Sequence, residues 1–237
     1  MEELRVIDLV LPCYNPPPGW DKRVVACLNN LSKRCDTVRF RVFIVSDGSV
    51  RGFEDSVFLY LNEKIKDVEI IRYQENRGKG YALRTAIKRC ASEFIIYTDY
   101  DFPYVEDSFY DVVEALLSKD SDIIVAVRAA NYRKNLPPVR RILSKSSHLC
   151  NRWILGLEIV DTQGGLKAFT ARGRDIFLQT RVNGFLFDTE FIYRAKKNHL
   201  RIKQITARIR NDIQVSNFGF GIMKQEIENF ITIIRHR

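Results

Sequence analysis

The stretch EFIIYTDYD, residues 93–101, is an apolar run that ends in two aspartates. A short run that is apolar on both faces and followed by polar residues predicts a buried strand. Side chains two residues apart point to the same side of a strand, so Asp99 and Asp101 should converge. Two carboxylates this close repel each other unless a cation lies between them. The stretch therefore predicts both a central strand and a cation site at its end.

Apolar runs of strand length alternate with segments of helical periodicity on both sides of this stretch. The predicted strands are 5–12, 40–47, 68–73, 93–101 and 122–128, and the predicted helices are 21–34, 56–64, 79–91 and 106–119. This alternation predicts the α/β class, with a mostly parallel central sheet flanked by helices. Ligands of such sheets bind beyond the carboxyl ends of the strands. We therefore expect the chemistry where these runs end.

The pattern changes after Arg128. The elements expected there are a long amphipathic helix over 139–156, a short strand within 160–171, a helix over 187–198, a strand over 200–210 and a final amphipathic segment over 221–237. No internal repeat, low-complexity tract or linker interrupts the chain. Residues 1–237 are therefore expected to form a single domain.

The composition is that of a globular chain with an excess of positive charge. The 237 residues are 46% hydrophobic and carry a formal net charge of +9. No run approaches the roughly 18 apolar residues of a spanning helix, so we expect a soluble chain without a signal peptide. Scattered cysteines without metal-binding spacing predict reduced thiols in a cytoplasmic compartment. Because the basic residues form no aromatic-studded platform, we expect no nucleic acid as partner, whereas phosphorylated small molecules and an anionic membrane surface both fit the charge.

Three predicted strands end in turn-rich loops, which are PCYNPPPG at 12–19, VSDGS at 45–49 and QENRGKG at 74–80. Loops of this kind leave backbone amides free, and their glycines permit close approach to a ligand. Asp47 is placed to accept hydrogen bonds from a base or a ribose. Arg77 and Lys79, where a glycine-containing loop opens a helix, suit a diphosphate. Each of these signals is weak alone, and it is their order along the chain that is specific.

In that order and spacing, six motifs resemble the family 2 glycosyltransferases of GT-A fold, most closely the dolichyl- and polyprenyl-phosphate sugar synthases. The motifs are PCYN at 12–15, VSDGS at 45–49, NRGKG at 76–80, YTDYD at 97–101, DTQGGLKAF at 161–169 and FDTE at 187–190. The similarity runs from about Ile7 to about Arg210. It implies a nucleotide-binding half, about 1–101, and an acceptor-binding half, about 102–237.

The resemblance implies a divalent ion, Mg²⁺ or Mn²⁺, on Asp99 and Asp101, bridging the diphosphate of a UDP- or GDP-sugar. A site of carboxylate oxygens suits a hard cation that keeps waters and takes ligands from phosphates. Further roles are implied by the matching motifs. They are nucleotide contacts at Pro12, Tyr14, Asn15, Asp47, Arg77, Lys79 and Asp99, donor-sugar contacts at Gly164 and Gly165, acceptor contacts at Arg128, Arg140, Arg141 and Ser144, and catalytic carboxylates at Asp188 and Glu190.

The resemblance also implies a single, inverting displacement, and the acceptor decides which groups it needs. A sugar hydroxyl needs a carboxylate to take its proton, for which Asp188 and Glu190 are the candidates. A polyprenyl monophosphate is already anionic near neutral pH, because its second pKa is about 6, so it needs cations more than a base. A lipid phosphate acceptor would place the enzyme at the cytoplasmic membrane face, as a peripheral protein serving the cell envelope.

Three positions depart from the pattern of the resembling synthases. Pro16 replaces a frequent acidic residue, Pro103 replaces a glutamine that helps to bind metal, and Gly164 replaces a cysteine. No C-terminal membrane helices are expected either. A transferase that acts on a glycan hydroxyl in surface polysaccharide synthesis therefore remains an alternative, as does a catalytically silent binding member of the fold. A nucleotidyltransferase is disfavoured, because PCYNPPPG lacks the basic residue it would want after the first strand.

Overall fold

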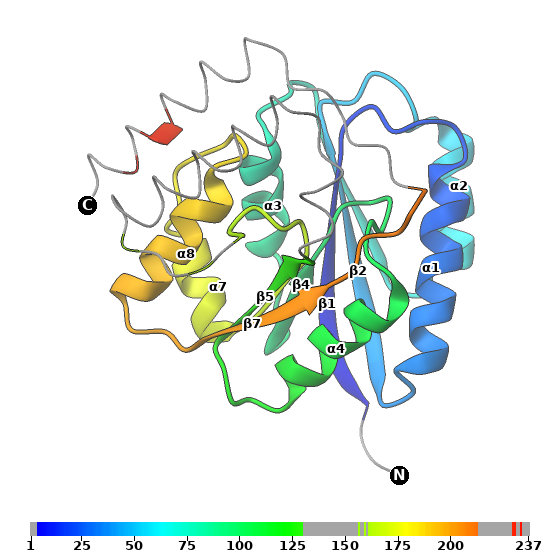
Figure 1. Ribbon diagram of the computed structural model, residues 1–237. Helices are drawn as coiled ribbons and strands as arrows, with labels where there is room; N and C mark the ends of the chain where they lie inside the picture. The colour runs from blue at the N-terminus through cyan, green and yellow to red at the C-terminus, as the bar shows by residue number, and fades with distance from the viewer. Residues whose placement is uncertain are drawn as a thin grey trace.

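The computed structural model describes residues 4–129 and 161–212, together with Gly156, Ile159, Asn229, Phe230 and Ile233. A seven-stranded sheet in the order β3-β2-β1-β4-β6-β5-β7 forms its centre (Figure 1). The strands are β1 (Arg5–Cys13), β2 (Val38–Asp47), β3 (Val68–Tyr73), β4 (Phe94–Tyr97), β5 (Ile123–Arg128), β6 (Lys167–Thr170) and β7 (Ile202–Ala207). The helices are α1 (Trp20–Arg34), α2 (Asp55–Lys64), α3 (Lys79–Ile87), α4 (Glu106–Leu117), α7 (Ala171–Phe177) and α8 (Phe187–Lys197).

The sheet is mostly parallel, which confirms the predicted fold class. Strand β1 pairs in parallel with β2 and β4, β2 with β3, and β5 with β7. Strand β6 runs antiparallel to both of its neighbours, β4 and β5. The sequence did not predict this reversal, because a four-residue strand carries no signal of its direction. One sheet joins strands from both halves of the chain, while the single domain over 1–237 stays a prediction.

Helices cover both faces of the sheet (Figure 1). Alternate residues of β1 divide between the two layers: Ile7, Leu9 and Leu11 pack in the cluster with α1, α2 and α4, and Val10 packs in the cluster with α3, α7 and α8. This explains why the strands read as continuous apolar runs. The loops at the carboxyl edge are therefore anchored on a sheet that is buried from both sides.

The second half of the chain matches the expectations where it is described. Helix α8 and strands β6 and β7 lie within the predicted ranges, whereas the short helix α7 was not predicted. The long helix expected over 139–156 lies outside the described residues, apart from Gly156. Phe230 and Ile233, from the predicted final segment, pack in the cluster with α3, α7 and α8. Within 4–129 and 161–212, no helix combines the length and apolar character that crossing a bilayer requires.

A buried carboxylate joins β1 to its neighbours. The Asp8 side chain is fully buried and accepts hydrogen bonds from Arg41 Nε at 2.8 Å and Nη2 at 2.7 Å. It also accepts the Ser92 N–H at 3.0 Å and the Ser92 hydroxyl at 2.8 Å. All four contacts are charge-assisted, so the buried charge is fully compensated. Asp8 thereby ties β2 and the loop before β4 to the central strand.

We expect Asp8→Asn to lower the free energy of unfolding by about 2–3 kcal/mol, because the amide cannot accept the full fork of Arg41 and leaves buried donors unpaired. Urea titration followed by circular dichroism measures this loss. Glu69→Gln, in the exposed Arg89–Glu69 pair, is the matched control and should change stability by less than about 0.5 kcal/mol. Equal stabilities of the two variants would contradict a structural role for Asp8.

Candidate active site

Asp99 and Asp101 lie in the loop that follows β4, at the carboxyl edge of the sheet. The loop is tight: the Phe102 N–H donates to the Asp99 carbonyl at 3.0 Å, and Phe102 has a φ of 46°, in the left-handed region. Burial raises the pKa of the Asp101 carboxyl, and the negative charge of Asp99 raises it further. The two carboxylates therefore act on each other, but the predicted strand over 93–101 is too long: β4 ends at Tyr97, and a tight turn rather than strand spacing brings Asp99 and Asp101 together.

The donor atoms of this pair fit a hard divalent cation. Carboxylate oxygens are what Mg²⁺ and Mn²⁺ prefer, and a cation would relieve the repulsion between Asp99 and Asp101. Within the described ranges 4–129 and 161–212, no group of three or more His, Cys, Asp or Glu side chains could hold a metal ion. A cation on Asp99 and Asp101 would thus need its other ligands from a substrate and water.

Three separate segments meet at the Asp99 carboxylate. Lys79, the first residue of α3, donates from Nζ to Asp99 Oδ1 at 2.5 Å. Gly165 covers the other oxygen, because a Cβ at that position would lie 2.5 Å from Asp99 Oδ2 and 3.7 Å from Lys79 Nζ. Burial works to lower the pKa of Lys79, but the negative charges of Asp99, Asp188 and Asp101 outweigh it and raise that pKa. The predicted diphosphate, metal and donor-sugar residues thus lie side by side.

Asp47 organises the loop that leads into α3. Its Oδ1 accepts the Tyr73 hydroxyl at 2.7 Å and the Arg77 N–H at 2.8 Å. Its Oδ2 accepts the Asn76 amide at 3.1 Å and the Gly78 N–H at 2.9 Å. These four donors match the four acceptor positions of a carboxylate. Asp47 therefore fixes the backbone that presents Lys79, and its predicted contact with a base or ribose stays a prediction.

The loop after β1 is tied to the loop after β2. The Asn15 N–H donates to the Ser49 hydroxyl at 3.0 Å, and the Asn15 side-chain oxygen accepts the Val50 N–H at 2.9 Å. Asn15 has a φ of 44°, which asparagine tolerates better than most residues. Beside it, Tyr14 is exposed. The two loops thus form one wall at the edge, where the sequence predicts nucleotide contacts for Pro12, Tyr14 and Asn15.

A buried ion pair lies next to Gly164 and Gly165, the glycines predicted to contact the donor sugar. The register of β4 and β6 places Lys167 opposite Tyr97, and Lys167 Nζ lies 2.8 Å from Asp188 Oδ1 and donates to the Gly164 carbonyl at 2.6 Å. The Tyr97 hydroxyl also donates to Asp188. Burial raises the pKa of the Asp188 carboxyl and lowers that of the Lys167 ammonium, while the charge of each partner opposes the shift. Lys167 thus connects the glycine turn to the predicted catalytic carboxylate.

Glu190 is fully engaged within its own neighbourhood. Its Oε2 accepts the N–H groups of Arg181 and Val182, each at 2.8 Å, and its Oε1 accepts Arg194 Nε at 2.7 Å. The side chain is buried. These contacts hold the segment that precedes α8, which itself packs on Gly80 of α3. The catalytic role predicted for Glu190 stays a prediction, and its contacts give it a structural task.

Arg128, at the end of β5, forms a bidentate pair with Asp161. Its Nε lies 2.6 Å from Asp161 Oδ2 and its Nη2 lies 2.7 Å from Oδ1. Burial works to raise the pKa of Asp161, but the hydrogen bonds and charge of Arg128 outweigh it and lower that pKa. Arg128 is thus held beside the DTQGG turn. The other predicted acceptor residues, Arg140, Arg141 and Ser144, lie outside the described residues.

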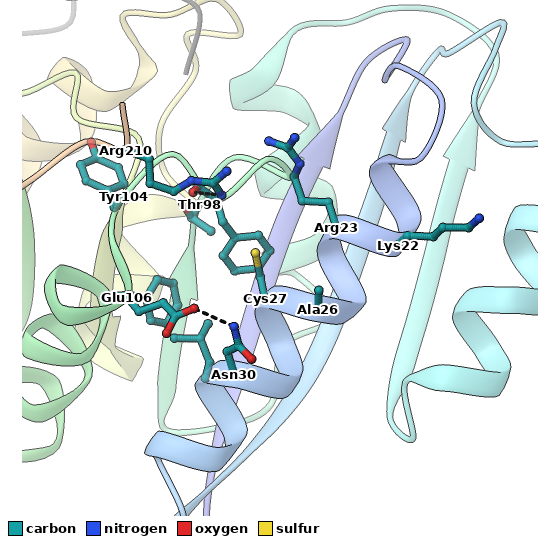
Figure 2. A pocket seen from close by; sticks show the side chains of 12 residues that line it. Lys22, Arg23, Ala26, Cys27, Asn30, Thr98, Tyr104, Glu106 and Arg210 are labelled. Atoms are coloured by element: carbon teal, nitrogen blue, oxygen red, sulfur yellow. Dashed lines mark hydrogen bonds between the residues drawn. The ribbon is translucent and has the colours of Figure 1, made fainter. Parts of the chain in front are cut away.

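The loop that carries Asp99 and Asp101 is also held by the segment after β7. Arg210 donates its N–H to the Pro103 carbonyl at 2.9 Å, and its Nη1 donates to the carbonyls of Asp101 and Phe102 at 3.4 and 3.3 Å. Arg210 also lines a cavity of about 530 Å³ that is bordered by residues of α1 and α4. Figure 2 shows Arg210 at one side of this cavity. Thr98 lines it, and its buried hydroxyl is the one buried polar side-chain atom without a hydrogen-bond partner in the described part of the chain.

The model of the family described as "Glycosyl transferase family 2" matches residues 8–228, which is nearly the whole chain. The chain belongs to glycosyltransferase family 2. A dolichyl-phosphate beta-glucosyltransferase of Trichomonas vaginalis is 25% identical over 242 residues, covering 98% of this chain and 74% of its own length. This confirms the resemblance that the six motifs carry, and it identifies the chain as a glycosyltransferase.

Solved structures show the same fold. Glucosyl-3-phosphoglycerate synthase from Mycobacterium tuberculosis, in complex with UDP, superposes with a TM-score of 0.70 at 14% identity and covers 97% of this chain and 80% of its own. The mannosyltransferase PcManGT from Pyrobaculum calidifontis, in complex with GDP-Man and Mn²⁺, superposes with a TM-score of 0.65 at 16% identity and covers 98% and 63%. The glycosyltransferase therefore has the predicted GT-A fold.

Sequence reasoning missed several residues that shape the site of this glycosyltransferase. Tyr73 and Asn76 secure Asp47, Asp161 holds Arg128, and Lys167 is paired with Asp188. Lys167 left one signal in the sequence, because a lysine inside the apolar run LKAF is unusual for a buried strand. Asn76 and Asp161 stand in the NRGKG and DTQGGLKAF motifs, but the sequence did not show what they contact, since their partners lie far away along the chain.

Asp47→Asn tests whether Asp47 holds the loop that presents Lys79. One acceptor oxygen becomes a donor, so an N–H of Arg77 or Gly78 loses its partner. We expect amide exchange in residues 76–79 to accelerate about tenfold or more, measured by hydrogen exchange and mass spectrometry. Asp55→Asn, at an exposed position in the first turn of α2, is the control. Unchanged protection of 76–79 in the Asp47 variant would refute this assignment.

Proposed function

We propose that this glycosyltransferase transfers a hexose from a UDP- or GDP-sugar to a polyprenyl or dolichyl phosphate, with inversion at the anomeric carbon. The observation that carries the choice of acceptor is the state of the two predicted bases. Asp188 is buried and paired with Lys167 and Tyr97, and Glu190 accepts three hydrogen bonds from its neighbours. A hydroxyl acceptor needs a base, whereas a phosphate acceptor is already anionic.

The donor half of the proposal rests on the cluster at the end of β4. Asp99 and Asp101 would hold Mg²⁺ or Mn²⁺, which when bound neutralises charge that develops on the leaving nucleoside diphosphate. Lys79, at the N-terminus of α3, is placed to bind a diphosphate oxygen. Gly165 lets the backbone approach Asp99 closely, which brings this turn, the proposed contact of the donor sugar, beside the proposed metal ligand. Asp47 keeps these groups in place through the loop at 76–78.

The names of relatives support the acceptor. Several relatives that this chain matches are dolichyl-phosphate beta-glucosyltransferases. A lipid phosphate would require contact with a membrane, for which the net charge of +9 is suited at an anionic surface. We propose peripheral placement at the cytoplasmic membrane face on these grounds. Arg140, Arg141 and Ser144 remain the proposed contacts of the acceptor phosphate.

A glycan hydroxyl is the second candidate acceptor, and the state of Arg128 favours it. The fork of this side chain is occupied by Asp161, so it does not stand ready for a phosphate. In that reaction Asp188 would have to leave Lys167 to take a proton. The two candidates share the donor site and differ only in the acceptor they need.

Asp99→Asn and Asp101→Asn test the metal assignment. Each removes one negative charge from the proposed cation site, so we expect the Mn²⁺-dependent part of nucleotide binding to fall about tenfold or more in each. Isothermal titration with UDP and GDP, with and without Mn²⁺, measures it. Asp175→Asn, an exposed position on α7, should behave like the parent protein. Metal-dependent affinity that survives in both variants would exclude these carboxylates as ligands.

The proposed reaction is tested by product formation. The purified protein is incubated with Mn²⁺ or Mg²⁺, a panel of UDP- and GDP-sugars, and either a short polyprenyl phosphate, a free oligosaccharide or no acceptor. We expect release of nucleoside diphosphate to require the polyprenyl phosphate and to yield a lipid-linked sugar. Turnover that responds to the oligosaccharide alone would favour the second candidate, and binding without turnover on any acceptor would favour a silent member of the fold.

A further inference from the structure

The ammonium group of Lys79 lies against Asp99, the proposed metal ligand, where a bound metal ion would be expected. Its Nζ lies 2.5 Å from Asp99 Oδ1, and the backbone of Gly165 lies close to Oδ2, where a Cβ would come within 2.5 Å. A divalent ion on the same carboxylate would therefore stand within a few ångströms of the ammonium. Two cations at that separation repel each other strongly in a site that is partly shielded from water. Metal and ammonium thus compete for Asp99.

The backbone around Lys79 is fixed, so only its side chain can resolve this competition. The Gly78 N–H is held by Asp47 Oδ2 at 2.9 Å, and the Gly80 N–H donates to the Asn183 carbonyl at 2.8 Å. A Cβ on Gly80 would lie 2.5 Å from the Val182 carbonyl, which shows how closely the start of α3 packs. The Lys79 side chain, by contrast, has a flexible four-carbon stem. It is 19% exposed and Asp99 is 37% exposed, so neither side chain is sealed from solvent.

We propose that Lys79 is an exchangeable counter-ion that couples metal binding to donor binding. Without donor, its ammonium neutralises Asp99. When a nucleoside diphosphate enters, the ammonium turns to a phosphate oxygen, and Asp99 becomes available to the divalent ion. The divalent ion and the nucleoside diphosphate then bind cooperatively, because each ligand stabilises the position of the Lys79 side chain that the other ligand requires. This inference rests on the proposed function and adds an order to it: the free protein binds metal weakly.

The competition predicts an effect of opposite sign on the two ligands. In Lys79→Met the resident cation is gone, so the affinity of the free protein for Mn²⁺ should rise about tenfold, within the range usual for such couplings. The affinity for UDP or GDP should fall, because the diphosphate loses its ammonium partner. If Lys79 only supported the fold, its substitution would instead weaken the binding of both Mn²⁺ and nucleotide. Electron paramagnetic resonance of unbound Mn²⁺ and titration of nucleotide measure the two affinities without turnover.

Lys88→Met is the matched control. Lys88 caps the other end of α3, is exposed, carries the same charge and belongs to none of the predicted sites. It should leave the Mn²⁺ affinity of the free protein unchanged within about twofold, as expected for an exposed charge. Lys79→Gln is the second variant, which keeps a polar group in case the methionine disturbs folding. Both Lys79 variants should show the same rise in Mn²⁺ affinity.

The outcomes separate this inference from the proposed function. If the parent protein binds Mn²⁺ and nucleotide cooperatively and neither Lys79 variant gains Mn²⁺ affinity, the exchange is refuted and the donor site stands. If the parent protein binds no nucleotide with or without Mn²⁺, the proposed function fails. A rise in Mn²⁺ affinity in both Lys88→Met and the Lys79 variants would show a general effect of charge and would also refute the exchange.

Discussion

The balance of charge at one edge of the sheet is the constraint on which this site depends. The carboxylates of Asp99, Asp101, Asp161 and Asp188 gather there, and the cations of Lys79, Arg128 and Lys167 lie among them. Burying such groups is unfavourable unless each charge has a partner. Asp161 and Asp188 are compensated by Arg128 and Lys167. Asp99 is paired with Lys79, whereas Asp101 is compensated by the more distant charges of Lys79 and Arg23. This uneven division leaves the loop of Asp99 and Asp101 open to a further cation.

The same balance of charge bears on which acceptor the enzyme can use. The donor side is assembled from loops that leave parallel strands, and their backbone is fixed by the four hydrogen bonds of Asp47. The carboxylates predicted to act on the acceptor, Asp188 and Glu190, are already paired with Lys167 and Arg194. A phosphate acceptor carries its own negative charge and needs neither carboxylate as a base. A hydroxyl acceptor must lose its proton to a base, and Asp188 could act as that base only after its buried pair with Lys167 is broken.

The sequence predicted the strands well, because continuous apolar runs followed by polar turns leave little choice in an α/β chain. The end of β4 is the exception: it stops at Tyr97 rather than at Asp101, because the backbone turns at Asp99. It placed Asp47, Lys79 and Asp99 at one edge by the same logic. It could not assign partners, since Tyr73 reaches Asp47 and Lys167 reaches Asp188 only through the register of the sheet. The direction of β6 was equally hidden, because four residues cannot show which way they run. Contacts between segments far apart in sequence are thus what the structure adds.

The reversed strand β6 has a consequence for how this site can vary. Most loops at the carboxyl edge leave a strand, but the turn at Gly164 and Gly165 enters one, because β6 runs antiparallel to β4 and β5. Lys167, opposite Tyr97, pins the first residue of that strand. Changes in this turn would therefore alter the surroundings of Asp99, which Gly165 contacts, without shifting the pairing of β6. The turn can vary while the loops that leave the parallel strands keep their geometry.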